Sequence, residues 1–227
     1  MTCYSAGFDF GSSSASFAVL ADDCVLFDRE IPLPARNASG LPALMSDILL
    51  EFDLTFDDIT SWSVGAGPGS FTGLRIASSF VSGLAFRKDH IRTRGVSSAV
   101  ALGRTVFTPS EPVMVLYDGR KGELLGFGLK VAEDGEFVED GFQTVVRNES
   151  DLAKLRSSYR DFAALQVDKE AIRALCPLSV NLIYFAERLY AAYLASWRKD
   201  DFTRPMTDLT YLRPAVFVPP SEVRTGL

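Results

Sequence analysis

The most informative stretch of the sequence runs from Gly65 to Ile76 and reads GAGPGSFTGLRI. It follows an apolar run over Trp62–Ala66, which predicts a buried strand, and it leads into a helical pattern over Thr72–Phe86. Phosphate-binding loops lie at such strand-to-helix connections, because the free N–H groups of a helix N-terminus attract anions. This corner is therefore the first candidate for a functional loop in an α/β fold.

Three common loop motifs do not fit this corner. The dinucleotide-binding pattern G-x-G-x-x-G would need glycine in place of Ser70 or Thr72. The Walker motif needs Gly-Lys-Ser/Thr, and the first lysine of the chain is Lys88. The esterase pattern G-x-S-x-G around Ser70 would need glycine in place of Pro68. The alternative is a tight turn in which the glycines allow close packing and Ser70 or Thr72 caps the helix.

Composition and net charge argue against several classes of function. The 227 residues fit one large domain or two small ones. The 23 Lys and Arg against 29 Asp and Glu give a formal net charge of −6, which disfavours a main role in gripping nucleic acid. The single histidine, His90, excludes a two-histidine metal site in this chain, and its polar neighbours make it a poor candidate for a catalytic base.

Targeting and redox signals are also absent from the sequence. The first residues lack the basic region of a signal peptide, and no apolar run approaches the ~20 residues that span a bilayer. Cys3, Cys24 and Cys176 stand far apart and outside any metal-binding spacing. A cytoplasmic protein with reduced thiols and no membrane segment is expected.

The order of predicted elements suggests two related halves. Each half begins with an antiparallel strand series around an Asp-containing glycine turn and continues into helices. The stretch Thr108–Pro112 separates them, which predicts one subdomain over residues 1–108 and a second over residues 109–227, with a Pro-rich tail. In the second half, the spacing of apolar residues predicts a long helix over Ser179–Trp197.

Five segments, in this order along the chain, resemble the TsaB (YeaZ) family. The run Gly67–Ile76 carries the most specific match, and the others are Gly83-Leu84-Ala85, Gly95-Val96-Ser97-Ser98, Asp118-Gly119-Arg120-Lys121-Gly122-Glu123 and Tyr211-Leu212-Arg213. The sequence departs from the family at Asp9-Phe10-Gly11-Ser12, where Asp-Thr-Ser/Ala is usual, and at Arg36–Ser39, which lacks the family's histidine. The aromatic residue usual after Gly-Glu is also replaced, by Leu124 or Leu125.

The resemblance implies an α/β chain with the actin-like ATPase (ASKHA) fold, built of two ribonuclease-H-like subdomains. It implies a non-catalytic subunit that dimerises with the transferase TsaD, which forms N6-threonylcarbamoyladenosine in tRNA, and that the ATPase TsaE joins. The isolated chain is expected to be inactive, without catalytic residues or a metal site of its own. ATP or ADP and a metal are expected only in the complex, tRNA is contacted only through it, and a homodimer is an alternative state.

Small residues at three- and four-residue spacing predict a helix face that another backbone can approach closely. The residues expected at the partner interface are Gly69, Ser70, Phe71, Thr72, Gly73, Leu74, Arg75, Ala77, Ser78 and Val81. The alternative is that this face packs inside the monomer. If the face is the interface, Ala77→Trp leaves the monomer folded and abolishes association.

Three polar residues are candidates for contact with a nucleotide or a partner: Asp9, Ser12 and Arg120. A guanidinium in a loop suits anionic groups, but Arg120 is equally well explained as a turn residue paired with Asp118 or Glu123. Asp9 and Ser12 lie in a segment that resembles the first phosphate loop of actin-fold kinases.

An actin-fold ATP-dependent kinase is therefore the rival function. The turn at Asp118 would have to serve as the second phosphate loop, but it lacks the Gly-Gly-Gly-Thr character of such loops. A peptidase is a third alternative, for which one histidine and no G-x-S-x-G leave little support.

Overall fold

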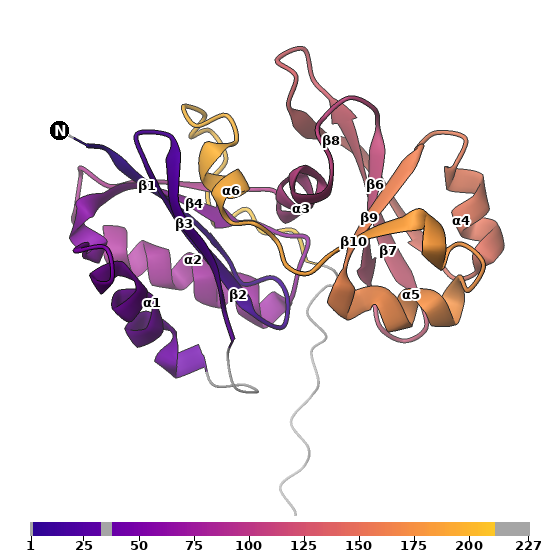
Figure 1. Cartoon of the computed structure of the whole chain (residues 1–227), viewed down its shortest axis with the longest axis horizontal. Helices are drawn as coiled ribbons and strands as arrows, with labels where there is room; N and C mark the ends of the chain where they lie inside the picture. The colour runs from indigo at the N-terminus through magenta and orange to yellow at the C-terminus, as the bar shows by residue number, and fades with distance from the viewer. Residues whose placement is uncertain (1, 33–37, 212–227) are drawn as a thin grey trace, which may run out of the picture.

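In the computed structural model, which describes residues 2–32 and 38–211, the strands form two mixed five-stranded sheets (Figure 1). The first sheet has the order β3-β2-β1-β4-β5 and the second β10-β9-β6-β7-β8. The first consists of β1 (Tyr4–Asp9), β2 (Ala15–Ala21), β3 (Cys24–Ile31), β4 (Ile59–Gly65) and β5 (Arg92–Val96). The second consists of β6 (Val113–Asp118), β7 (Leu124–Val131), β8 (Phe137–Val146), β9 (Asp161–Leu165) and β10 (Ile183–Ala186).

The two sheets share one topology. In each, the first three strands in chain order pair antiparallel as a meander, and the fourth and fifth continue parallel from the first. The second sheet, counted from β8, therefore repeats the order of the first. This duplication confirms the α/β actin-like fold of two ribonuclease-H-like subdomains. The division of the chain at residue 108 stays a prediction.

Two helices cover the outer face of the first sheet (Figure 1). In α1 (Leu41–Leu50), three residues at four-residue spacing, Leu41, Met45 and Leu49, are buried. The longer α2 (Phe71–Ala85) buries its small and apolar stripe against the same core cluster, in which Ala77 and Val81 join Phe8 and Trp62. The second sheet carries α4 (Glu149–Leu155) and α5 (Lys169–Leu175).

A further helix, α3 (Ser98–Val106), lies between the two lobes (Figure 1). Its buried residues share one apolar cluster with residues of both sheets, from Leu20 of β2 to Val115 of β6. The two lobes are therefore joined by a continuous hydrophobic core.

The long helix predicted over Ser179–Trp197 is wrong. The segment instead forms a short 3-10 turn, the edge strand β10, a connector and the five-residue helix α6 (Ala192–Ser196). The apolar spacing fitted a helix, but parallel pairing of Ile183–Ala186 with β9 buries Ile183 and Ala186 in the second sheet. Tertiary pairing overrides local periodicity here.

The chain returns to the first sheet after β10. Helix α6 packs against β1, β2 and β4. The Arg188 guanidinium pairs with Asp28 of β3, and the N–H of Ala192 donates to the Asp28 carboxylate at 2.8 Å. Residues that follow the second sheet in sequence thus complete the packing of the first.

The buried side chain of Arg94 in β5 holds the segment that follows β10 (residues 187–201, the return segment) against the first sheet. Its guanidinium, with 1% of the residue exposed, donates to the carbonyls of Leu194, Ala195, Arg198 and Asp201, and its Nε donates to Ser63 Oγ at 2.8 Å. Burial lowers the pKa of Arg94 to about 10, so the group remains charged at neutral pH. The Arg94 side chain therefore binds carbonyl groups at the end of α6 and in the turn that follows this helix.

Candidate functional site

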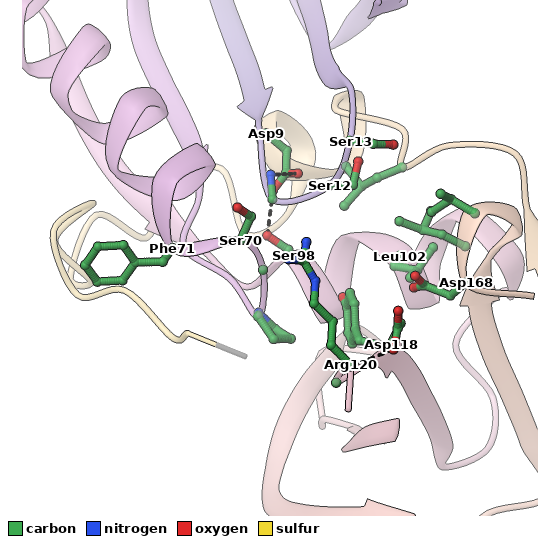
Figure 2. Close-up of a pocket in the computed structure, with 18 of the residues that line it drawn as sticks. Asp9, Ser12, Ser13, Ser70, Phe71, Ser98, Leu102, Asp118, Arg120 and Asp168 are labelled. Atoms are coloured by element: carbon green, nitrogen blue, oxygen red, sulfur yellow. Dashed lines mark hydrogen bonds between the residues drawn. The ribbon is translucent and has the colours of Figure 1, made fainter. Parts of the chain in front are cut away.

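A cleft of about 560 Å³ opens between the two sheets, at the ends of β1 and β6 (Figure 2). Three loops that the sequence singled out form part of its walls: the turn after Asp9, the corner at Pro68–Thr72 and the turn at Asp118–Arg120. The rest of the lining comes from α3, from the ends of β6 and β9 and from the segments that follow β9 and β10. The structure therefore brings the three predicted contact residues Asp9, Ser12 and Arg120 to one cavity, although Asp9 and Arg120 are 111 positions apart in the chain.

The buried carboxyl group of Asp9 connects several elements of the first subdomain through hydrogen bonds. It is 4% exposed, its Oδ1 accepts the Gly11 N–H at 2.8 Å, and its Oδ2 accepts the Ser98 hydroxyl at 2.6 Å. Ser98 Oγ in turn accepts the Gly67 N–H at 3.2 Å. A Cβ at Gly65 would lie 1.9 Å from Asp9 Oδ2. Burial raises the pKa of Asp9, and its hydrogen bonds to Ser98 and Gly11 oppose that rise. The carboxyl thus links β1, the glycine corner and α3.

The glycines of the corner permit close backbone approach within the chain. The Ser70 N–H donates to the Gly11 carbonyl at 2.8 Å, and a Cβ on Gly69 would lie 2.7 Å from Gly11 Cα. A Cβ on Gly73 would lie 1.8 Å from the Phe10 carbonyl oxygen. The glycines therefore allow the close packing that the tight-turn interpretation predicted, and they hold the start of α2 against the loop after β1. The predicted cap is not formed: Ser70 occupies the N-cap position, but its side chain makes no capping hydrogen bond.

The turn after β6 presents Arg120 from a strained backbone. Arg120 has φ +58°, Lys121 +54° and Gly122 +75°, so two non-glycine residues in a row adopt the left-handed region. Asp118 Oδ1 accepts the Arg120 N–H at 2.7 Å and stabilises this turn. The Arg120 side chain runs from the turn toward Ser98 and Ser70 on the opposite wall (Figure 2).

Two residues of this cleft, Tyr117 and Asp168, were not predicted from the sequence. Tyr117 is the last buried residue of β6, and its hydroxyl has no hydrogen-bond partner within the described chain. Asp168 follows β9, the parallel neighbour of β6, and lies beside Asp118 (Figure 2). Carboxylates just beyond the ends of adjacent parallel strands are a detectable signal, but it requires the strand order, which the sequence did not supply.

Asp168 is expected to make stability depend on pH. Burial, and to a lesser extent the negative charge of Asp118, raise its pKa from 3.8 to about 6, against a hydrogen bond from the Asp118 backbone. Because the folded pKa is raised, the stability from this group is complete below about pH 4 and is lost as the pH rises through about 6. Asp168→Asn should therefore gain stability over the natural chain on going from acid to neutral pH, by no more than about 3 kcal/mol.

Urea unfolding of both proteins near the two ends of this pH range measures that gain. The two proteins are compared with each other at each pH, so titrating groups that do not interact with Asp168 contribute equally to both and cancel. A difference between the two proteins that stays constant with pH would contradict the raised pKa of Asp168.

The predicted partner face divides into two parts. Gly69, Gly73, Leu74, Ala77, Ser78 and Val81 are buried in the monomer, Ser70 and Phe71 are half-buried, and only Thr72 and Arg75 are exposed. Ala77 and Val81 lie in the core beneath the first sheet. The expectation that Ala77→Trp leaves the monomer folded is therefore wrong, because no space exists for the indole. The small residues serve contacts inside the chain.

An aromatic stack marks the exposed start of α2. The Arg75 guanidinium carbon lies 4.0 Å from the Phe71 ring centroid, and Arg75 Nε donates to the Tyr211 hydroxyl at 3.1 Å. The rings of Phe71 and Tyr211 are 4.7 Å apart, and Gly69 pairs with Tyr211 as a parallel bridge. This stack uses the Tyr of the predicted Tyr-Leu-Arg motif; its Leu212 and Arg213 lie outside the described residues.

Among residues 2–32 and 38–211, no three carboxylate, imidazole or thiol groups gather closely enough to hold a metal ion. In the same part of the chain, no helix combines the length and the apolar character that crossing a bilayer requires.

Comparison with known proteins agrees with this fold. The family model of TsaD, the tRNA N6-adenosine threonylcarbamoyltransferase, matches residues 36–172, more than half of the chain. A curated relative, the tRNA threonylcarbamoyladenosine biosynthesis protein TsaB of Escherichia coli (strain K12), is 27% identical over 143 residues, 62% of this chain and 61% of the relative. TsaB of Haemophilus influenzae is 30% identical over 118 residues, 51% and 49% of the two chains. The matches thus span about half to three fifths of the relatives' length.

Two solved structures share the fold over nearly the whole chain. YeaZ from Pseudomonas aeruginosa superimposes with a TM-score of 0.68 at 20% identity, covering 91% of this chain and 98% of YeaZ. A protein described as similar to the peptidase YeaZ from Pseudomonas aeruginosa gives a TM-score of 0.70 at 22% identity, covering 93% and 100%. These two likenesses show the shared fold. The family-model match over more than half of the chain shows that the chain belongs to the family that the TsaD model describes, and its curated relatives place it in the TsaB (YeaZ) group.

Proposed function

We propose that this chain is a non-catalytic subunit that pairs with a TsaD-type transferase in the synthesis of N6-threonylcarbamoyladenosine in tRNA. The names of its curated relatives and the TsaD family match support this role. The observation that supports a non-catalytic role is the environment of the Asp9 carboxylate. In an actin-fold kinase the corresponding acid holds a metal-bound water, whereas here both carboxylate oxygens are engaged by Gly11 and Ser98 and the residue is 4% exposed.

The outward faces of α1 and α2 support a partner surface different from the buried stripe. Leu50 of α1 is 60% exposed, and Phe86, just after α2, is 68% exposed. Helix α2 also exposes the small residues Ser79, Ser82 and Gly83. Exposed apolar side chains and small residues on a helix surface suit contact with a helix of another protein. The outer helix face, defined as the exposed residues of α1 and α2 with Phe86, is the proposed contact for the transferase.

A charge on the outer helix face should disrupt this pairing. Leu50→Glu is expected to reduce recovery of the cognate TsaD-type subunit in co-expression by at least about tenfold, because a buried unpaired carboxylate is costly. Leu178→Glu is the matched control: Leu178 is 80% exposed on the second lobe, and its variant should recover the partner normally. Equal recovery with the two variants would place the interface elsewhere.

Reconstitution tests the function itself. The purified chain should modify no tRNA alone and should restore modification when added to the transferase with a TsaE-type ATPase, ATP and a metal ion. In this proposal nucleotide and metal bind in the complex, tRNA is met only through it, and the free chain is a monomer or a homodimer. Modification by the transferase without this chain would refute the proposed role.

An actin-fold kinase remains the second candidate, because Asp9 and the turn at Asp118 line one cleft. Steady ATP turnover by the isolated chain, lost on Asp118→Asn, would favour the kinase over the subunit.

A further inference from the structure

A second, shallow pocket of about 440 Å³ lies in the second lobe. We call it the arginine pocket; its lining consists of Glu111 and Pro112, just before β6, and of Arg156, Ser157, Ser158 and Arg160, from the loop between α4 and β9. Because β6 and β9 run parallel with Val113 opposite Asp161, the arginine pocket lies at the N-terminal ends of both strands. The cleft described above lies at the other end of β6, so the two sites are separate.

The two arginines of this pocket have no partner within the described residues. The side chains of Arg156 and Arg160 are exposed and make no hydrogen bond, ion pair or ring contact there, and Glu111 pairs with neither. Every other arginine in residues 2–32 and 38–211 has a hydrogen bond, an ion pair, a ring contact or an electrostatic interaction. Two adjacent guanidinium groups are therefore left over by the fold and are available to an anion.

The local sequence around this pocket is basic although the whole chain is acidic. Residues 154–160 read KLRSSYR, with three cationic side chains and no acidic one, in a chain of net charge −6. Lys154 pairs with Asp151 at 3.6 Å, which leaves the two arginines as the unpaired charges of this stretch. The loop is thus a small positive patch on a negative protein.

A third unpaired cation lies at the same end of the second sheet. Val113 of β6 pairs with Leu129 of β7, so the next residue, Lys130, lies beside the start of β6. A Cβ at Gly128 would lie 2.3 Å from the Tyr159 hydroxyl, and side chains two positions apart on a strand share a face. Lys130 therefore lies on the face of the sheet that carries the loop; it is exposed and has no ion pair among the described residues.

The serines supply hydroxyl groups next to the guanidinium groups. Ser157 donates its hydroxyl to the Lys154 carbonyl at 2.9 Å, whereas the Ser158 hydroxyl makes no hydrogen bond within the described chain. Arginine and serine side chains are among the groups that contact nucleic-acid phosphates, and the planar guanidinium can bind two phosphate oxygens at once. The composition of the arginine pocket therefore matches a phosphate group.

The exposure of the pocket favours a polymer over a small anion. All the residues that contribute its charges and hydroxyls are exposed, so water and salt screen a single bound phosphate. A nucleic acid presents many phosphates and releases counterions when one of them is neutralised, which strengthens binding to an open patch. The net charge of −6 confines such contact to this patch, so it positions a nucleic acid and does not hold it alone.

The position of the pocket leaves it open when the transferase is bound. Helix α4, which leads into the loop, and the outer helix face on α1 and α2 lie at opposite ends of the molecule (Figure 1). A partner on the outer helix face therefore does not cover the arginine pocket, and the second lobe can reach a further component of the complex.

From these observations we infer that Arg156 and Arg160 bind a backbone phosphate of the tRNA substrate inside the complex, with the Ser158 hydroxyl as a further donor. The inference rests on the proposed function and deepens it: the chain positions tRNA in addition to pairing with the transferase. A phosphate contact of this kind fixes orientation and carries no sequence specificity of its own.

Salt-dependent tRNA binding by the assembled complex tests this contact. Complexes of the full chain with the transferase and the ATPase are titrated into fluorescently labelled, unmodified tRNA between about 50 and 200 mM salt, and anisotropy is measured. The double variant Arg156→Gln, Arg160→Gln should bind tRNA at least about fivefold more weakly at about 100 mM salt, with a slope of log affinity against log salt smaller by about 1. Glu111→Gln should bind tRNA more tightly, because it removes a negative charge beside the phosphate.

Arg173→Gln is the matched control. Arg173 is exposed on the same lobe, outside the pocket, and pairs with Glu170 at 2.8 Å. Its variant makes the same change of charge and should change tRNA affinity by less than about twofold. All variants should unfold in urea at the same midpoint as the natural chain and recover the transferase equally in co-expression, because the substituted side chains are exposed.

An unchanged tRNA affinity and salt slope in the double variant, or an equal loss in Arg173→Gln, would overturn the inference. Loss of the ATPase from the double-variant complex with tRNA binding retained would assign the pocket to an acidic protein surface instead. Binding of inorganic phosphate to the chain below about 1 mM, lost in the double variant while tRNA affinity stays the same, would assign it to a free anion. A natural chain that recovers no transferase would refute the proposed function and this contact with it, whereas an intact complex with unchanged tRNA affinity refutes the contact alone.

Discussion

Replacing Arg94 by leucine should destabilise the chain by about 3–5 kcal/mol, the expected cost of removing one partner from a buried charged network. The guanidinium donates to four carbonyl groups of residues 194–201 and to Ser63. Leucine fills most of the volume but offers none of these donors, so the carbonyls at the end of α6 are left buried or must find water. The return segment is then expected to separate from the first sheet.

Denaturant unfolding measures the total effect, and hydrogen exchange of residues 192–201 locates it. Arg92→Leu is the matched control. Arg92 is exposed on the same strand, and its guanidinium carbon lies 3.7 Å from the Phe202 ring centroid, a contact worth about 0.5–1 kcal/mol at an exposed site. If the two substitutions cost the same, the hydrogen bonds of Arg94 do not fasten the segment.

The second large effect is expected for Gly73→Ala in α2. The new Cβ would lie 1.8 Å from the carbonyl oxygen of Phe10, so the helix or the loop after β1 must move. We expect a loss of at least about 2 kcal/mol, as for other cases of overpacking against backbone. Gly69 and the wall of the cleft would shift with the helix.

Gly83→Ala is the control in the same helix. Nothing lies within 4 Å of a Cβ at Gly83, which is exposed. Alanine should therefore stabilise the protein there by up to about 1 kcal/mol through helix propensity. Thermal unfolding of both variants measures the difference, and effects of the same sign at the two positions would contradict the close approach at Gly73.

These two glycines show how far the sequence could be interpreted. Two glycines in one helix imply a compensating contact, and the structure provides it at Gly73 but not at Gly83. The pattern could not identify the contacting group, which is the Phe10 carbonyl of this chain rather than a partner helix. The spacing of small residues predicts a helix face without large side chains. Only the burial of those residues in the structure shows which part of the protein covers that face.

The candidate site was predicted in part. Asp9, Ser12 and Arg120 were selected from local motifs, and all three line one cleft. Tyr117 and Asp168 follow no local motif and become visible only when β6 and β9 pair as neighbours. The helix prediction for residues 179–197 was wrong for a related reason. An edge strand and a helix can share one spacing of apolar residues, and the pairing with β9 decides between them.

The sequence by itself determined the family, the duplicated α/β architecture and the position of the glycine corner, because these depend on local turn chemistry and on the order of apolar runs. Tertiary structure alone decided that the small face of α2 is internal, that the chain returns to its first sheet through Arg94, and that acidic residues from distant segments share one cleft. Each of these depends on contacts between residues far apart in the chain, and such contacts leave no periodic signal in a single sequence.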